Sequence, residues 1–115
     1  MPKSDVIRLH HMLDATRKAV EFSKDRQRVD LDTEELLALG LVRLIEVIGE
    51  AASKIELDVH DRYPDIPWRS IIGARNRFIH GYDDVDLDIV WSIITNDLPP
   101  LAKQLEQAIE SEESG

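Results

Sequence analysis

The segment from Thr33 to Leu57 constrains the fold more than any other part of this 115-residue chain. Its apolar residues recur every three or four positions, which is the period of one face of an α-helix. One row holds Leu37, Leu41, Leu44, Ile48, Ala51 and Ile55, and Leu36, Val47 and Ala52 widen it well beyond a single face. A helix that is apolar most of the way round is central to a fold or shared with a second subunit. We expect both here, with the bundle on one side and a second copy of the chain on the other.

Two details refine the prediction for this helix. Asp32 and Glu35 have the Asp-x-x-Glu spacing of a capping box, which predicts a helix start near Thr33. Gly49 costs the helix about 1 kcal/mol relative to alanine. A glycine is expected at this position if the backbone of another helix approaches it closely. We therefore expect a close helix–helix contact at Gly49.

Glu46 and Glu50 lie in the thin polar stripe of the same helix, and their spacing leaves two interpretations open. They can pair with Arg43 and Lys54 on their own helix, three and four positions away. Alternatively, one of them holds Arg75 from a different helix. The sequence does not separate these two arrangements.

The remaining segments also predict helices, because strand-forming aromatic residues are few and good helix formers occur in long runs. Ser4 is a candidate N-cap for the first helix. The expected helices cover residues 4–26, 33–57, 67–81, 87–95 and 96–110, with extended or turned chain at 59–66 and a break near Asn96. Residues 1–110 are therefore expected to form one all-α domain, an up-and-down bundle of four to five helices. Residues 111–115 are expected to form an acidic, disordered tail.

Composition and charge exclude several classes of function. The chain has no cysteine, so disulfides, thiolate nucleophiles and cysteine-based metal sites are ruled out. We expect a cytoplasmic protein, since no apolar run could cross a bilayer and no signal-peptide core is evident. The formal net charge is −9, whereas general nucleic-acid binders carry an excess of lysine and arginine. Any contact with nucleic acid would therefore depend on a local basic patch.

The best such patch lies on the helix expected between Pro67 and Gly81. Proline suits the first turn of a helix, and glycine suits the residue that ends one. The apolar face carries Trp68, Ile71, Ile72, Phe78 and Ile79, and the opposite face carries Arg69, Gly73, Asn76, Arg77 and His80. This separation predicts one buried and one solvent-exposed side.

Arg75 interrupts the apolar face of that helix. A guanidinium at such a position costs free energy unless a charged or hydrogen-bonded partner meets it. For a lone arginine, a salt bridge to a neighbouring helix is the favoured interpretation. The grouping of Arg75 with Asn76, His80 and Tyr82 at one helix end indicates a functional site instead.

The segment Arg75-Asn76-Arg77-Phe78-Ile79-His80 resembles the Arg-x4-His motif of HEPN domains. Together with Gly81-Tyr82 it resembles the Arg-x4-His-x-Tyr signature of HepT-like toxins. Three further blocks resemble the same family in the same order, at residues 48–52, 63–68 and 97–101. The resemblance covers most of the chain. It implies a HEPN-like helical bundle that forms a homodimer, with the motifs of both subunits facing one cleft.

The resemblance also implies a function. The chain would be the toxin of a type II or modification-based toxin–antitoxin system, an endoribonuclease that needs neither a metal nor another cofactor. Its partner would be a small nucleotidyltransferase antitoxin of the MNT type, which neutralises the toxin by binding it. In this family the antitoxin can transfer AMP from ATP to the motif tyrosine, which here is Tyr82.

The chemistry of RNA cleavage fits these residue types. RNA supplies its own nucleophile, the 2′-OH, so a protein needs to provide proton transfer and charge stabilisation. His80 would be the acid and base, since histidine exchanges protons near neutral pH, and Arg75 would bind the phosphate. Asn76 would orient the phosphate or His80, and Arg77 and Arg69 would be auxiliary phosphate contacts.

One geometric constraint follows from the spacing of Arg75 and His80. Residues five positions apart are separated by about 140° around a helix. One straight helix therefore presents the two side chains poorly to a single phosphate. Either two copies across a dimer or a frayed helix end would bring them together.

Two other functions are compatible with the sequence. A non-catalytic dimeric HEPN module could bind a nucleotidyltransferase, and the charge of −9 favours that alternative. A nucleotide-binding accessory subunit could use the same basic face for ATP or AMP. The intact set of Arg75, Asn76, His80 and Tyr82 favours the ribonuclease.

Overall fold

The computed structural model of the chain describes residues 3–80 and 85–114, except for the side chains of residues 79 and 80. Its long helices are α1 (Lys3–Ser23), α3 (Glu35–Lys54), α5 (Trp68–His80) and α7 (Leu98–Ser114). Between them lie α2 (Asp30–Thr33), α4 (Leu57–Arg62), α6 (Leu87–Ser92) and a π-helical turn, η2 (Ile93–Asp97). The described ranges contain no strand, and the predicted all-α fold is confirmed. The break expected near Asn96 is the π-helical turn.

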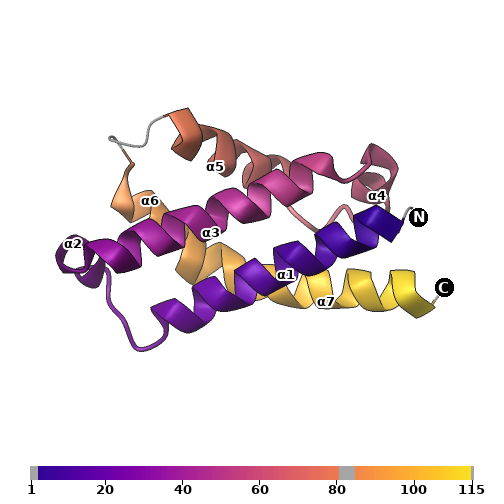
Figure 1. The fold of residues 1–115 in the computed structure, drawn as a ribbon. Helices are drawn as coiled ribbons and strands as arrows, with labels where there is room; N and C mark the ends of the chain where they lie inside the picture. The colour runs from indigo at the N-terminus through magenta and orange to yellow at the C-terminus, as the bar shows by residue number, and fades with distance from the viewer. Residues whose placement is uncertain (1–2, 81–84, 115) are drawn as a thin grey trace.

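Helix α3 occupies the middle of the bundle (Figure 1). It packs against α1 on one side and against α5 on another, and α7 packs against α1. The start of α1 and the end of α7 lie at the same end of the molecule, near α4 (Figure 1). The predicted central position of the apolar segment is therefore correct.

The side chains of α3 show which part of its wide apolar surface is used within one chain. Leu41, Ile48 and Ala52 are at most 2% exposed and belong to the core. On the opposite side Leu36 is 85% exposed and Leu39 is 38% exposed. One side of α3 thus builds the core, and the other leaves apolar side chains in solvent.

Gly49 is the point of closest contact between α3 and α5. A Cβ atom added at Gly49 would lie 2.3 Å from Arg75 Cβ and 2.9 Å from the carbonyl oxygen of Ile71. No side chain can occupy that space unless the helices move apart. A Cβ added at Gly40 or Gly73 would meet nothing within 4 Å. The close approach predicted at Gly49 is confirmed.

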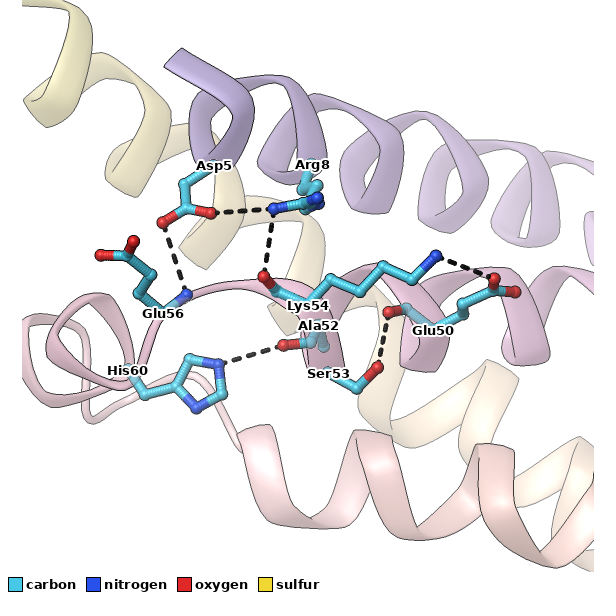
Figure 2. Close-up of polar contacts among 8 residues, drawn as sticks. All are labelled: Asp5, Arg8, Glu50, Ala52, Ser53, Lys54, Glu56 and His60. Carbon is cyan, nitrogen blue, oxygen red and sulfur yellow. Dashed lines mark hydrogen bonds and ion pairs between the residues drawn. The ribbon is translucent and has the colours of Figure 1, made fainter. Parts of the chain in front are cut away.

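A buried carboxylate joins the start of α1 to the end of α3 (Figure 2). Asp5 is 1% exposed and accepts hydrogen bonds from Arg8 Nη1 at 3.3 Å and from the backbone N–H of Glu56 at 3.4 Å. Arg8 also donates to the carbonyl oxygen of Lys54 at 3.1 Å. The last carbonyls of a helix have no intrahelical partner. Arg8 supplies one here, and Asp5 is neutralised by the same guanidinium.

His60 supports the same end of α3 from the other side (Figure 2). Its Nε2 lies 3.1 Å from the carbonyl oxygen of Ala52. Its ring stacks on Trp68 with 4.1 Å between ring centroids and an interplanar angle of 7°. His60 therefore links α4 to α3 and α5.

Two helix starts differ from the predicted ones. Helix α1 begins at Lys3, so Ser4 lies inside the first turn and is not its N-cap. The N-cap of α3 is Glu34, which makes no side-chain capping bond. The backbone leaves the helical region at Glu34, and Asp32 belongs to the separate helix α2. The predicted capping box between Asp32 and Glu35 is therefore wrong.

The segment at 59–66 was expected to be extended or turned, and its first part is helical. Residues 57–62 form α4, and Val59 on this short helix is fully buried. Burial of one apolar side chain is enough to hold a single helical turn or two against the bundle. The helix-disfavouring effect of Pro64 applies only after α4 has ended.

The predicted disordered tail is also wrong for residues 111–114, because α7 continues to Ser114. Tyr63 donates a hydrogen bond from its hydroxyl group to Glu112, and Arg62 pairs with the same carboxylate at 3.4 Å. Burial and the hydrogen bond to Glu112 raise the pKa of Tyr63. These contacts with the end of α4 anchor the last turns of α7.

Alanine substitutions at the three described α-helical glycines should separate close packing from helix propensity. Gly40→Ala and Gly73→Ala should raise the free energy of unfolding by roughly 0.5–1 kcal/mol, because alanine favours a helix and neither site is crowded. Gly49→Ala should lower it by about 1–3 kcal/mol, because the added methyl group forces α3 and α5 apart. Urea denaturation measures the three changes. A Gly49→Ala protein as stable as Gly40→Ala would contradict the contact between α3 and α5.

Candidate functional site

Helix α5 has one buried and one exposed face, as its sequence predicts. Trp68 and Phe78 are 7% and 1% exposed. Arg69, Asn76 and Arg77 are exposed on the other face. The helix lies at the outer edge of the bundle and rests on α3 (Figure 1). Its polar face is therefore open to a ligand.

Arg75 lies on the side of α5 that faces α3 and is half-buried. The first carbons of its side chain rest on Gly49. Its Nη1 donates a hydrogen bond to Asn76 Oδ1 at 3.0 Å. Its Nε is buried and has no hydrogen-bond acceptor among the described residues. The structure thus brings Arg75 and Asn76 together and leaves a buried donor unused.

Glu46 and Glu50 pair with residues of their own helix. Arg43 Nη1 lies 3.4 Å from Glu46, and Lys54 Nζ lies 3.3 Å from Glu50; the second pair is drawn in Figure 2. Within the described part of the chain, neither carboxylate is at ion-pair distance from Arg75. The first of the two interpretations is confirmed, and the predicted possibility of a salt bridge from α3 to Arg75 is not realised.

The arginines of α5 differ from the other arginines of the chain in their partners. Every arginine outside α5 forms an ion pair with a carboxylate, namely Arg8, Arg17, Arg26, Arg28, Arg43 and Arg62. Arg69, Arg75 and Arg77 form no such pair with any carboxylate in residues 3–80 and 85–114. In this chain of net charge −9, the arginines that lack a carboxylate partner among the described residues therefore all lie on one helix.

His80 is the last residue of α5, and its side chain lies outside the described residues. Gly81 and Tyr82 lie outside them entirely, so the roles predicted for His80 and Tyr82 stay predictions. The backbone does show whether α5 is frayed between Arg75 and His80, which is one of the two arrangements expected from the sequence. Positions 75 and 80 belong to one uninterrupted helix, and about 140° around its axis separates them. No frayed turn lies between them.

A cleft of 240 Å³ lies beside α5, between α3, η2 and α7, and the sequence did not predict it. Its floor is apolar and includes Ile48, Ile71 and Leu101, and its rim includes Asp65 and Asp97. None of its lining residues is basic. A cleft with two carboxylates and no cation is a poor site for a phosphate, so the arginine face of α5 is the better candidate for nucleic acid.

Two features are absent from the described residues. No three histidine, aspartate or glutamate side chains among them gather in a way that could hold a metal ion. No described helix is long and apolar enough to cross a membrane.

The fold and the site define a small helical bundle whose helix α5 carries three arginines without a carboxylate partner among the described residues. The family model described as "Ribonuclease HepT-like" matches residues 12–108 of this chain. The chain therefore belongs to the HepT-like ribonuclease family.

Several relatives resemble the chain over nearly its whole length. The protein named "Putative RNase MJ1380" of Methanocaldococcus jannaschii is 32% identical over 107 residues, which are 92% of this chain and 98% of that one. The protein named "Putative RNase MJ0125" of the same organism is 33% identical and covers 95% of both chains. The protein named "Probable ribonuclease HepT" of Thermococcus cleftensis is 29% identical, covering 93% of this chain and 97% of that one. No solved structure matched the chain.

Arg75→Met should leave the free energy of unfolding within about 0.5 kcal/mol of the wild-type value. The guanidinium has no described carboxylate partner, and methionine keeps an apolar stem against Gly49. Arg8→Met is the matched control and should cost about 1–3 kcal/mol, because it leaves buried Asp5 without its cation. Urea denaturation compares the two. An Arg75→Met protein as unstable as Arg8→Met would mean that Arg75 is structural.

Proposed function

We propose that this chain is a HepT-type toxin, a metal-independent endoribonuclease whose site includes the three arginines of α5. The observation that carries the proposal is the collection of Arg69, Arg75 and Arg77 on one helix without described carboxylate partners. The membership of the chain in the HepT-like ribonuclease family supports it. A general nucleic-acid binder would be basic overall, whereas this protein would rely on a local patch.

The proposed reaction uses the 2′-OH of RNA as the nucleophile. A base removes the 2′-OH proton, the oxygen attacks the adjacent phosphorus, and the bond to the 5′-oxygen breaks as that oxygen takes up a proton. The products are a 2′,3′-cyclic phosphate and a 5′-OH. His80 would carry the protons, and Arg75 would stabilise the added negative charge on the phosphate.

The described contacts give Asn76 a specific part in this scheme. Its side-chain oxygen accepts a hydrogen bond from Arg75 Nη1 at 3.0 Å. That bond fixes the plane of the guanidinium, which matters because arginine binds phosphate through parallel N–H groups in a defined fork. Asn76 is therefore proposed to orient Arg75, and Arg69 and Arg77 to add phosphate contacts along the exposed face.

A homodimer would solve the divergence of positions 75 and 80 on one helix. In a pair of chains, Arg75 of one copy and His80 of the other can face the same phosphate. The exposed leucines of α3 offer a surface for such pairing, since Leu36 and Leu39 are 85% and 38% exposed. Fully burying an exposed leucine such as Leu36 contributes about 1.5–3 kcal/mol, and the partly exposed Leu39 contributes less.

The proposed partner is a nucleotidyltransferase antitoxin that binds the toxin and transfers AMP from ATP to Tyr82, with pyrophosphate leaving. The new phosphodiester would add negative charge close to the arginine face. Such a charge would repel RNA and compete for the same guanidinium groups.

The second candidate is a non-catalytic module that binds a partner or a nucleotide through the same face. The net charge of −9 favours it, because that charge slows the encounter with RNA. Nucleotide binding that saturates without any RNA cleavage would support this second function.

Cleavage of a mixed RNA substrate in the presence of EDTA tests the proposed reaction. The wild-type protein should leave 2′,3′-cyclic phosphate ends, and His80→Ala and Arg75→Ala should each lower the rate by about 100-fold or more. Arg17→Ala is the control, since Arg17 is an exposed arginine paired with Glu106 on another helix. Protein whose mass shows an unmodified Tyr82 should be used. No cleavage by such protein would favour the non-catalytic function.

Light scattering at micromolar concentration tests the proposed dimer. The wild-type protein should be dimeric, and Leu36→Glu should dissociate it and lower the cleavage rate, because a charge cannot be buried cheaply between two apolar surfaces. Leu57→Glu is a matched control, because Leu57 is 75% exposed but lies on α4. A monomeric wild-type protein, or equal effects of both substitutions, would contradict a pairing through α3.

A further inference from the structure

Gly49 lies outside the Arg-x4-His-x-Tyr motif, yet it is the residue on which the motif arginine rests. We propose that Gly49 is a positioning residue for Arg75. Because residue 49 has no side chain, α5 can approach α3 closely, and this approach determines the position of the guanidinium group. The inference rests on the proposed function of Arg75 in binding RNA phosphate.

The first argument is the geometry of the contact. A Cβ at position 49 would lie 2.3 Å from Arg75 Cβ and 3.0 Å from Arg75 Cγ. It would also lie 2.9 Å from the carbonyl oxygen of Ile71, which is a backbone atom of α5. A rotation of the arginine side chain could relieve only the contact with Cγ. The other two require a movement of the α5 backbone, so a methyl group at position 49 must displace Arg75.

The second argument is that both ends of the Arg75 side chain are held. Gly49 receives its first carbons, and Asn76 Oδ1 accepts a hydrogen bond from Nη1 at 3.0 Å. Between them, Nε is buried without an acceptor in the described part of the chain. A buried donor without a partner is unfavourable. Because Nε is enclosed, an incoming phosphate would meet the terminal nitrogens of the guanidinium, and their placement depends on the side chain staying in this position.

The third argument concerns the acids beside Gly49. Glu46 and Glu50 stand three positions before it and one position after it, and either would be a strong acceptor for a nearby guanidinium. Arg43 and Lys54 engage them instead, at 3.4 and 3.3 Å. The Glu46 side chain is only 14% exposed and is thus held against the helix surface. Arg75 therefore contacts α3 at Gly49, which has no charged side chain.

The test combines activity, binding and a spectroscopic signal. Gly49→Ala should lower RNA cleavage by about 100-fold, which is the scale of loss for a displacement of about 1 Å in a catalytic group. Gly40→Ala lies on the same helix as Gly49 with open space around the added methyl group, and it should retain wild-type activity. Leu105→Ala, in the core of α7, controls for a loss of stability that does not touch Arg75.

A double-mutant cycle then asks whether Gly49 acts through Arg75. Binding of an RNA whose 2′-OH groups are replaced by hydrogen should weaken in Gly49→Ala and in Arg75→Ala, and the double variant should bind no worse than Arg75→Ala alone. Additive losses would overturn the proposal, because Gly49 would then serve some other part of the site.

The Nε–Hε signal of Arg75 in nuclear magnetic resonance provides a readout that does not depend on RNA. In the wild-type protein it should be rigid and slow to exchange, unlike the signals of exposed Arg69 and Arg77. It should shift or broaden in Gly49→Ala and remain unchanged in Gly40→Ala. If Gly49→Ala does not fold, the wild-type signal alone decides, and an Arg75 as mobile as Arg69 would overturn the proposal. If RNA is neither bound nor cut but the Arg75 signal behaves as expected, the proposed function fails and the positioning by Gly49 stands.

Discussion

The contact between α3 and α5 at Gly49 determines what the rest of the site can do. α5 lies at the edge of the bundle and is held chiefly by α3, so the residue at position 49 sets the distance between the two helices. Glycine weakens a helix, and its cost of about 1 kcal/mol is offset by the apolar burial of Trp68 and Phe78 against the core. Arg75 stands directly over this contact. A packing constraint in the centre of the fold is therefore also a constraint on the position of Arg75, the residue that we propose binds RNA phosphate.

The distribution of charge follows a similar division between fold and site. Several carboxylates form ion pairs with arginines of helices other than α5, as in the pairs Asp5–Arg8, Glu106–Arg17 and Glu112–Arg62. The first pair lies within α1, the other two join α7 to α1 and to α4, and the arginines of α5 take no part in them. An acidic protein can in this way keep three guanidinium groups available on one helix. In the proposed function these arginines would bind RNA locally, while the overall negative charge would oppose unspecific binding along a nucleic acid.

Several features could be predicted from the sequence because they depend on local periodicity. The apolar row of α3 identified the central helix, Gly49 identified the close contact, and the two faces of α5 followed from residues three and four positions apart. The errors arose where distant residues decide the outcome. The sequence around Ser111 does not indicate that Glu112 contacts Tyr63 and Arg62. The sequence around Asp32 does not indicate that the backbone leaves the helical conformation at Glu34. The cleft beside α5 combines residues from four elements, so no single stretch could reveal it. Glu46 and Glu50 were ambiguous because a partner on the same helix and one on a neighbouring helix fit the same spacing.

The central claim is that RNA phosphates lie on the arginines of α5, and the salt dependence of RNA binding tests it most directly. Each phosphate contact with single-stranded RNA contributes about 0.7 to the slope of log affinity against log salt concentration. Each of the single variants Arg69→Gln, Arg75→Gln and Arg77→Gln should reduce the magnitude of that slope by about 0.7. The control variant Arg17→Gln should leave the slope unchanged. Equal slopes for all four variants and the wild-type protein would contradict the claim and would place RNA binding, if it occurs, elsewhere on the molecule.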